Sequence, residues 1–381
     1  MKKNSTGMQN RKQVKQAVTA PWKTGSKRKQ QLTIGLDLGD KTSRYCALDE
    51  DGEVLFERSV ATTKKGLTQV FGALGRCRVA LEVGTHSPWV SGLLKSLGHE
   101  LIVANARQVK LITQSSRKND KLDAQSLARL ARVDPQLLRP IQHRSEEAQQ
   151  HLMMIRVRAV LVEARTKLVN SARGFAKAAG ERLPNCDTDV LEVERLEGLP
   201  ASLRQVLKRL LEEVESLTEQ IHACDEEIEQ IAREKYPETA RLQQISGVGT
   251  LIALAFVLTI DDPARFRKSR EVGCYVGMRP KSRESGESQP QLGISKEGDV
   301  YLRKLLVQGA HYILGRRGPD TDLKRWGLKL CARGGKNAKK RVAVARKLGI
   351  LLHRLWVTGE AYEPLRNSQS RTTAQAKQQA A

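Results

Sequence analysis

The sequence of 381 residues is strongly basic, with 66 Lys and Arg residues against 42 Asp and Glu residues and a formal net charge of +24 at pH 7. This surplus makes nucleic acid the leading partner class, because neutralised phosphates release counterions and so favour binding without any reading of base sequence. The apolar stretches are shorter than the roughly 18 residues of a membrane span, and the N-terminus lacks the apolar core of a secretory signal. The six cysteines are not spaced as zinc ligands, so we expect a cytoplasmic protein with reduced thiols and no membrane contact.

Both ends of the chain are predicted to be disordered. Residues 1–31 contain nine Lys or Arg residues and no acidic residue, and they have few large apolar side chains. Such a segment cannot bury enough apolar surface to fold, so we expect a basic tail that binds phosphate nonspecifically. Residues 366–381 are expected to form a second tail.

Residues 32–142 predict an α/β domain. The runs LTIGLDL, SRYCALD and EVLFERSV indicate three antiparallel strands, with the hairpin signal Asp51-Gly52 between the last two. They are followed by helix, strand, helix, strand, a short helix near Val109 and a helix from Asp120. This order is typical of a ribonuclease-H-like (RuvC-like) fold, although order alone also allows another small α/β fold.

Four acidic residues of this domain are candidate metal ligands. Asp37 and Glu82 end the first and fourth strand-like runs, while Asp120 and Asp123 lie three apart at a helix start. Hard carboxylate oxygens suit Mg²⁺ or Mn²⁺, and two such ions about 4 Å apart can activate an attacking oxygen and stabilise a leaving one. Each acid alone also has a structural explanation, such as an N-cap at Asp120 or a turn residue at Asp37.

Residues 145–236 predict a helical, coiled-coil oligomerisation region. A basic helix-like stretch is followed by an apolar seam with steps of four and three, formed by Leu203, Leu207, Leu210, Val214, Leu217, Ile221, Cys224, Ile228 and Ile231. The partner of this seam is either the preceding helix or the same helix of another subunit. We favour the second, and therefore a homo-oligomer, from dimer to tetramer. Residues 185–235 contain 14 acidic and 6 basic residues, so this region is not expected to lie along DNA.

Residues 240–365 predict a mostly α-helical C-terminal domain that binds nucleic acid. Between residues 263 and 347 there are 22 Lys and Arg residues against 7 Asp and Glu residues. The turn Gly247-Val248-Gly249 either directs backbone N–H groups at a phosphate or simply joins two helices. The residues predicted across the chain to contact nucleic acid are Arg117, Lys118, Arg156, Arg165, Gly247, Gly249, Arg279, Lys281, Arg283, Lys296, Arg303, Lys304, Lys339, Lys340 and Arg341.

Ser285 lies in a Gly- and Ser-rich loop that follows Arg279, Lys281 and Arg283. A hydroxyl beside such cations can meet a phosphate whose charge is offset, although serine needs a base or a metal to become a nucleophile. By chemistry alone Ser282, Ser288 and Ser295 are equal candidates.

The chain resembles the DEDD transposases of bacterial insertion sequences, a family of bridge-RNA-guided recombinases. The resemblance rests on the four acids and on the C-terminal motifs LQQISGVG and FRKSREVGCYVGMRPKSRESGESQPQLGISKEGDVYLRKLLVQGA. It spans about Leu32 to Pro364. It implies that Ser285 is the nucleophile that joins DNA covalently beside Mg²⁺ or Mn²⁺ held by Asp37, Glu82, Asp120 and Asp123. It further implies DNA at element ends and target, and a structured guide RNA, as partners.

Two other functions compete with a transposase. A RuvC-like nuclease or junction resolvase would hydrolyse DNA with metal-activated water and leave no protein on the strand. A non-catalytic nucleic-acid-binding protein would use the positive charge alone. The basic N-terminal tail and the long acidic helix depart from the simplest family pattern and concern subunit geometry rather than chemistry.

Overall fold

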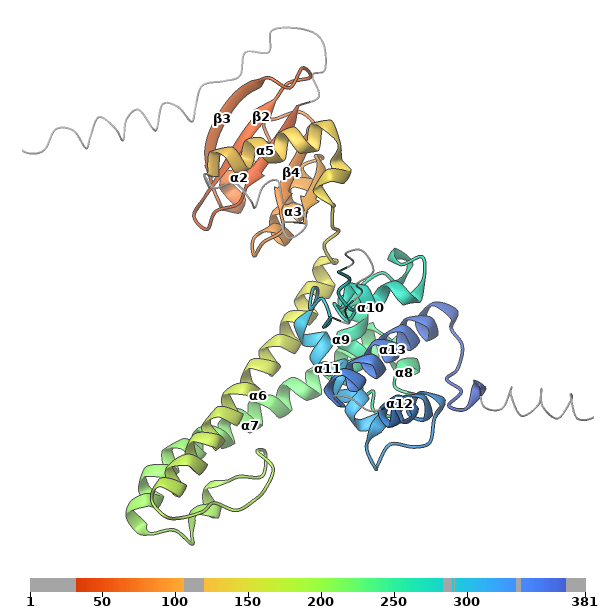
Figure 1. The fold of residues 1–381 in the computed structure, drawn as a ribbon. Coiled ribbons are helices and arrows are strands. Elements are labelled where there is room, and N and C mark those ends of the chain that lie inside the picture. Colours follow the sequence, from red (N-terminus) through yellow and green to blue (C-terminus); the bar gives the residue numbers. More distant parts are fainter. Residues whose placement is uncertain (1–31, 106–119, 284–289, 291, 334–336, 368–381) are drawn as a thin grey trace, which may run out of the picture. The chain divides into compact units, whose positions relative to one another are not determined.

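The computed structural model describes residues 32–105, 120–283, 290, 292–333 and 337–367. The chain divides into two compact units between His143 and Arg144 (Figure 1). Both predicted tails, apart from residues 366 and 367, and the helix expected near Val109 lie outside the described residues.

The first unit is a mixed α/β sheet domain. Its elements are β1 (Thr33–Asp37), β2 (Thr42–Leu48), β3 (Val54–Ala61), α2 (Lys64–Phe71), β4 (Arg78–Glu82), α3 (Ser87–Ser96), β5 (Glu100–Ala104), α5 (Asp120–Val133) and the short 3-10 helix η1 (Pro135–Leu138). The strands lie in the order β3-β2-β1-β4-β5. The first three strands are antiparallel as predicted, and β4 pairs in parallel with both β1 and β5.

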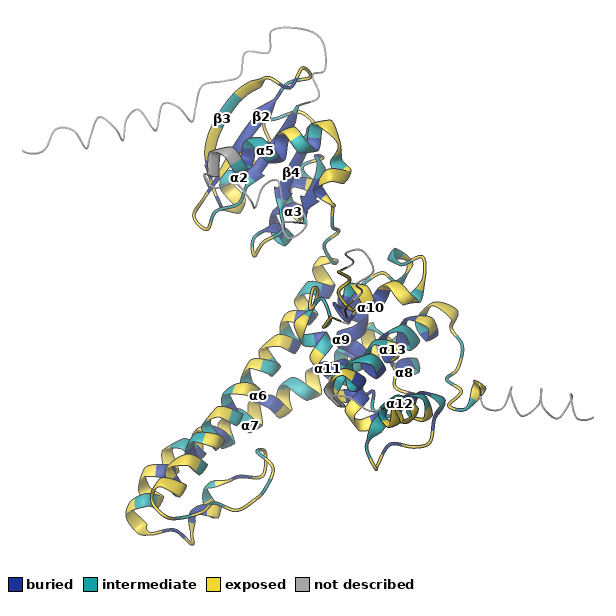
Figure 2. Cartoon of the chain, viewed as in Figure 1, coloured by how far each residue is buried: buried dark blue, intermediate teal, exposed yellow. Residues whose placement is uncertain are grey.

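Helices cover both faces of this sheet, which explains why β1 and β4 are apolar almost throughout. On one face Ile34 and Leu36 of β1 pack with side chains of α2 and α3, such as Phe71 and Leu94. On the other face α5 covers the sheet through Ala124, Leu127, Ala128 and Ala131. Central strands buried on both sides read as continuous apolar runs rather than as an alternation. Figure 2 shows these strands as buried beneath α5.

The second unit is mostly helical. Its elements are α6 (Glu146–Ala178), η2 (Val193–Leu196), α7 (Ala201–Lys235), α8 (Glu238–Leu242), α9 (Thr250–Ile260), η3 (Pro263–Arg265), η4 (Ser269–Glu271), α10 (Val272–Tyr275), α11 (Val300–Leu314), α12 (Asp322–Ala332) and α13 (Asn337–Thr358). Ser145 caps α6 by accepting the N–H of Ala148, and Glu146 and Glu147 suit the positive end of its dipole.

The long helices α6 and α7 lie side by side, as Figure 1 shows. Leu207 and Val214 of the predicted seam pack with Val169 and Ala172 of α6, and Ile228 packs with Ile155. The seam therefore has α6 of the same chain as a partner, the alternative to the intersubunit contact that we favoured from the sequence. Assembly through a coiled coil stays a prediction.

The core of the helical unit surrounds α9. Every residue from Ala253 to Ile260 is buried, which a helix tolerates only when other helices cover all of its faces. Residues of α6, α11 and α13 belong to the same cluster. The two regions predicted as 145–236 and 240–365 therefore share one core. None of the described helices is long and apolar enough to cross a membrane.

Candidate active site

Asp37 and Glu82 lie next to each other at one edge of the sheet. Asp37 is the last residue of β1 and Glu82 the last residue of β4, and the two strands are parallel neighbours. Leu36 and Leu81 are the last residues paired between β1 and β4, so each acid directly follows the last residue of that pairing. Side chains at corresponding positions of parallel strands point to the same face, so the two half-buried carboxylates share one face and one edge.

The helix α5 covers that same face. A Cβ atom on Gly35 would lie 1.9 Å from the carbonyl oxygen of Ala124, so this strand glycine lets the helix approach the sheet closely. Because side chains alternate along a strand, Asp37 shares the face of Gly35, and Glu82 shares the face of Ala80, which packs against α5.

The direction of α5 brings its first turn to the acidic edge. Arg78, the first residue of β4, donates from Nη1 to the carbonyl oxygen of Ala131 near the end of the helix, at 3.2 Å. The helix therefore runs antiparallel to β4, and its start lies at the edge where Glu82 ends the strand. Asp120 begins the helix and half-buried Asp123 immediately precedes Ala124. The side chain of Asp120 lies outside the described part.

The donor set at this edge fits a divalent cation by its chemistry, because carboxylate oxygens are the ligands that Mg²⁺ and Mn²⁺ prefer. Within the described residues, no three His, Cys, Asp or Glu side chains are grouped closely enough to hold a metal ion. The metal ligation by Asp37, Glu82, Asp120 and Asp123 therefore stays a prediction that the strand and helix positions favour.

Sequence reasoning did not find His86 at the same edge. His86 follows β4, and its Nε2 lies 3.5 Å from Oδ1 of Asp40 on the segment that follows β1. Its Nδ1 accepts the indole N–H of Trp89 at 3.2 Å, so a neutral imidazole carries its proton on Nε2, toward Asp40. The sequence offered one signal: Asp40 and His86 each follow, within four residues, a strand that ends in an acidic residue.

The segment that contains Ser285 begins and ends in an antiparallel stem. Pro280 and Ile294 form an antiparallel bridge, the N–H of Lys281 donates to Gly293 at 2.9 Å, and the N–H of Ser295 donates to Arg279 at 2.8 Å. Ser285 itself and Ser288 lie outside the described residues.

Two glycines lie at the base of this stem. Gly277 and Gly298 have φ angles of 71° and 81°, which side chains rarely adopt. A Cβ atom on Gly277 would lie 1.7 Å from the carbonyl oxygen of Glu297, and one on Gly298 would lie 1.9 Å from that of Tyr275. The two sides of the stem approach each other as closely as bare backbone allows.

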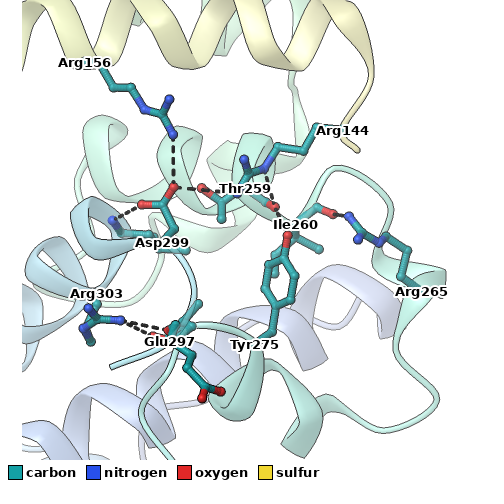
Figure 3. A network of polar contacts seen from close by, with 11 residues as sticks. Arg144, Arg156, Thr259, Ile260, Arg265, Tyr275, Glu297, Asp299 and Arg303 are labelled. Atoms are coloured by element: carbon teal, nitrogen blue, oxygen red, sulfur yellow. Dashed lines mark hydrogen bonds and ion pairs between the residues drawn. The ribbon is translucent and has the colours of Figure 1, made fainter. Parts of the chain in front are cut away.

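Arg303 of α11 joins the two sides of that base. Its Nη1 donates to the carbonyl oxygens of Val276 at 2.9 Å and Glu297 at 3.1 Å (Figure 3). We predicted Arg303 as a nucleic-acid contact, whereas here its guanidinium binds the backbone beside the Ser285 segment.

Asp299 connects the end of the stem to the rest of the helical unit. It caps α11 by accepting the N–H of Leu302, and its Oδ2 pairs with Arg156 at 3.3 Å and Arg144 at 3.6 Å (Figure 3). Its side chain is only 9% exposed, so solvent and salt screen these ion pairs less than pairs at the open surface. Arg144 also donates to the carbonyl oxygen of Thr259 at the end of α9.

The predicted nucleic-acid contacts differ in their surroundings. Arg165 and Lys340 are buried, and they donate to Thr218 and to the carbonyl oxygen of Cys331 within the chain. Arg341 is half-buried and lies 3.3 Å from His311. The exposed candidates are Arg156, Arg279, Lys281, Arg283, Lys296, Lys304 and Lys339. Arg117 and Lys118 lie outside the described residues.

The two glycines of the turn before α9 have structural roles. Gly247 has a φ angle of 91° and packs against α11, where an added Cβ atom would lie 3.1 Å from the carbonyl oxygen of Gly309. Gly249 is the N-cap of α9. A close backbone approach explains the glycine at position 247 but not the one at 249, and the phosphate contact of both stays a prediction.

An acidic sheet edge in an α/β unit, followed by a basic helical unit, indicates a protein that processes nucleic acid. Comparison with known proteins defines the class further. A family model described as a transposase matches residues 34–179, and the model of the transposase IS116/IS110/IS902 family matches residues 239–324.

Relatives extend the similarity over most of the chain. The transposase for insertion sequence element IS1111A of Coxiella burnetii is 30% identical over 341 residues, which cover 86% of this chain and 90% of the relative. A probable family 20 transposase of Pseudomonas aeruginosa is 28% identical, over 87% and 98% of the two chains. The transposase for element IS1328 of Yersinia enterocolitica is 29% identical, over 74% and 84%. The chain belongs to the IS116/IS110/IS902 family of transposases, as the resemblance predicted.

Proposed function

We propose that this transposase cuts and rejoins DNA through a covalent serine–DNA intermediate, with Ser285 as the nucleophile. Asp37, Glu82, Asp120 and Asp123 would hold Mg²⁺ or Mn²⁺, and a structured RNA from its own element would guide the choice of DNA. The observation that carries the proposal is the position of Asp37, Glu82 and the start of α5 at one edge and one face of the sheet.

The fold proposed for the first unit is ribonuclease-H-like. Three antiparallel strands, parallel crossovers to β4 and β5, and α5 over the acidic face support it. In such an arrangement acids from two neighbouring strands and one helix need no long loops to approach each other.

In the proposed reaction the Oγ atom of Ser285 attacks a DNA phosphorus atom. The serine hydroxyl loses its proton and forms a phosphoester bond, while the bond from phosphorus to a deoxyribose oxygen breaks and that oxygen takes up a proton. A hydroxyl of the partner DNA then attacks the same phosphorus and releases the serine, so the number of phosphodiester bonds is conserved. The bound metal would supply charge stabilisation at the phosphate and make an attacking oxygen easier to deprotonate.

The stem residues support a positioned serine. Arg303, Gly277 and Gly298 fix the base of the stem whose two sides precede and follow residues 284–289 in the sequence, and Arg279, Lys281 and Arg283 are exposed. Exposed cations at this place suit a phosphodiester, because they offset the charge that repels a nucleophile.

The competing function is a metal-dependent nuclease that uses water. A denaturing gel with end-labelled DNA separates the two, because only the serine reaction leaves protein attached to a cleaved strand. We expect Ser285→Ala and Asp37→Ala each to abolish recombination while nucleic-acid binding is largely retained. Ser282→Ala is the matched control. Full recombination by Ser285→Ala would refute the nucleophile, and cleavage without an adduct would favour the nuclease.

The proposed partners are DNA of element ends and target, guide RNA and further copies of the chain. Strand exchange joins two DNAs, so we expect a dimer or tetramer. Co-purification followed by RNA sequencing tests the guide, and a lack of enriched element-derived RNA with loops complementary to both DNAs would exclude it.

A further inference from the structure

A cavity of about 840 Å³ lies in the helical unit, away from the Ser285 stem. It is lined by α12, α13 and the segment after α13, and its walls include two aromatic rings, those of Trp326 and Tyr362. Its volume is within the range of about 300–1,000 Å³ that small-molecule pockets have.

Hydrogen bonds hold the outer wall of the cavity in place. The N–H of Asp322 donates to the carbonyl oxygen of Pro364 at 2.7 Å, and Oδ2 of Asp322 accepts the N–H of Asn367 at 2.7 Å. The N–H of Tyr362 donates to Oε1 of Gln244 at 2.8 Å. The cavity is therefore part of the folded unit rather than a gap beside a loose end.

The lining carries a surplus of positive charge. Five of its residues are cationic and three are acidic, the cations being Arg325, Lys329, Lys347, Arg354 and Arg366 and the acids Asp322, Glu360 and Glu363. Arg354 and Arg366 share the single carboxylate of Glu360, at 3.6 and 2.7 Å. Unlike Arg325, Arg354 and Arg366, neither Lys329 nor Lys347 has an acidic partner within 4.0 Å among the described residues, although the charge of Asp322 acts on Lys347 from farther away.

Lys347 lies against the indole ring. Its Nζ is 4.2 Å from the ring centroid of Trp326, a cation–π contact. Burial lowers the pKa of the Lys347 ammonium, and the negative charge of Asp322 offsets this effect only in part. An anionic group bound here would restore that lost stabilisation.

We propose that this cavity binds one nucleotide of a single-stranded nucleic acid, with its base beside Trp326 and Tyr362 and its phosphate at Lys347 and Lys329. Aromatic rings stack on any base, and lysines bind the phosphate of any nucleotide, so the site has no built-in base preference. A base inside a duplex is already stacked and paired and is not free to enter a cavity, so the site selects unpaired strands.

The proposal rests on the nucleic-acid substrate of the proposed function but not on its serine chemistry. A strand exchange guided by RNA leaves unpaired nucleotides, in the RNA loops or in displaced DNA, and either source offers the same base and phosphate. The affinity for single strands tests the cavity, whereas the covalent protein–DNA adduct tests Ser285. Either proposal can therefore fail while the other stands.

The test is fluorescence anisotropy of the full chain with labelled single strands of about eight nucleotides, oligo(U) and oligo(dT), and with a duplex of equal length. We expect Lys347→Met, which keeps an apolar stem on the indole, and Trp326→Leu each to weaken binding of at least one single strand by about tenfold. Trp326→Phe is expected to recover most of the loss, and duplex affinity to stay within about twofold.

Lys208→Met is the matched control, because Lys208 is an exposed lysine of α7 that pairs with Glu212. Circular dichroism shows whether each variant is folded. If Trp326→Leu does not fold, the affinity of Lys347→Met alone tests the proposal. Unchanged affinity for both single strands would overturn the proposal, and so would an equal loss for single strands and duplex. A loss for RNA alone or DNA alone supports it and identifies the source.

Discussion

The backbone of β1 at Gly35 lies in direct contact with the backbone of α5 at Ala124. A Cβ atom added at Gly35 would lie only 1.9 Å from the carbonyl oxygen of Ala124. The contact sets the distance from α5, which carries Asp120 and Asp123, to β1, which carries Asp37. The closeness of two backbones thus determines whether the four acids can act together.

Gly35→Ala is expected to displace α5 and destabilise the first unit by about 3 kcal/mol, near the upper end of overpacking effects. Hydrogen exchange should show that amide protection is lost in β1 and α5 and is unchanged in α13. Gly92→Ala is the control, because an added Cβ atom at this position of α3 would meet no atom of another described segment within 4 Å. Equal protection in Gly35→Ala and the parent chain would contradict the close contact.

Metal removal is expected to stop strand cleavage but not binding. EDTA should abolish cleavage and added Mg²⁺ or Mn²⁺ should restore it, because four ionised carboxylates repel a phosphate unless a cation lies between them. Glu82→Gln should raise the Mg²⁺ concentration for half-maximal cleavage at least about tenfold. Glu53→Gln, an exposed acid in the turn between β2 and β3 at the opposite end of the strands, is the matched control. Full cleavage in EDTA would exclude the metal proposal.

Arg303 is expected to act through the backbone of the stem rather than through phosphate. Arg303→Lys keeps the positive charge, but a lysine cannot reproduce the planar guanidinium that reaches Val276 and Glu297. We expect adduct formation to fall at least about tenfold in Arg303→Lys, with DNA affinity and its salt dependence unchanged. If Arg303→Lys retained adduct formation and Arg303→Met lost affinity, a direct phosphate contact would be the better explanation.

The contact of His151 in α6 with Tyr236, after α7, is expected to weaken in acid. Burial, and then the charge of Lys235, lower the pKa of His151 below its usual 6.5, and burial raises the pKa of Tyr236 to about 12. Tyr236 therefore donates to the neutral Nδ1 atom, at 2.8 Å. Below about pH 6.5 the unfolded chain binds the proton more readily than the folded one, so this stabilisation is present above pH 6.5 and is lost as pH falls through the lowered pKa.

Thermal unfolding from pH 8 to pH 5 measures this effect as a difference between the parent chain and His151→Gln. We expect the parent's advantage to shrink on acidification, because glutamine does not titrate. A constant difference across the range would show that folding does not change the pKa of His151.

Much of the first unit was predictable because its strands have short, local signals. The runs around Asp37 and Glu82 and the Asp51-Gly52 turn predicted elements that the structure contains, and a β-meander followed by crossovers leaves few strand orders. The family was also predictable, since its motifs lie in the sequence itself.

The roles of the basic side chains depended on tertiary contacts. Arg165, Arg303 and Lys340 have the same composition signal as exposed Lys296, yet they donate to groups within the chain. A charge count cannot distinguish them, because burial of an arginine depends on residues far away in sequence.

By itself the sequence determined the order of elements, the positive charge, the apolar seam of α7 and the acids at strand ends, because these depend on neighbouring residues and on local periodicity. Only the tertiary structure decided that α6 covers the seam, that the backbone of β1 at Gly35 touches α5, and that Lys347 lies over Trp326. These are contacts between distant segments, and no local pattern encodes the distance between two backbones or the partner of a buried charge.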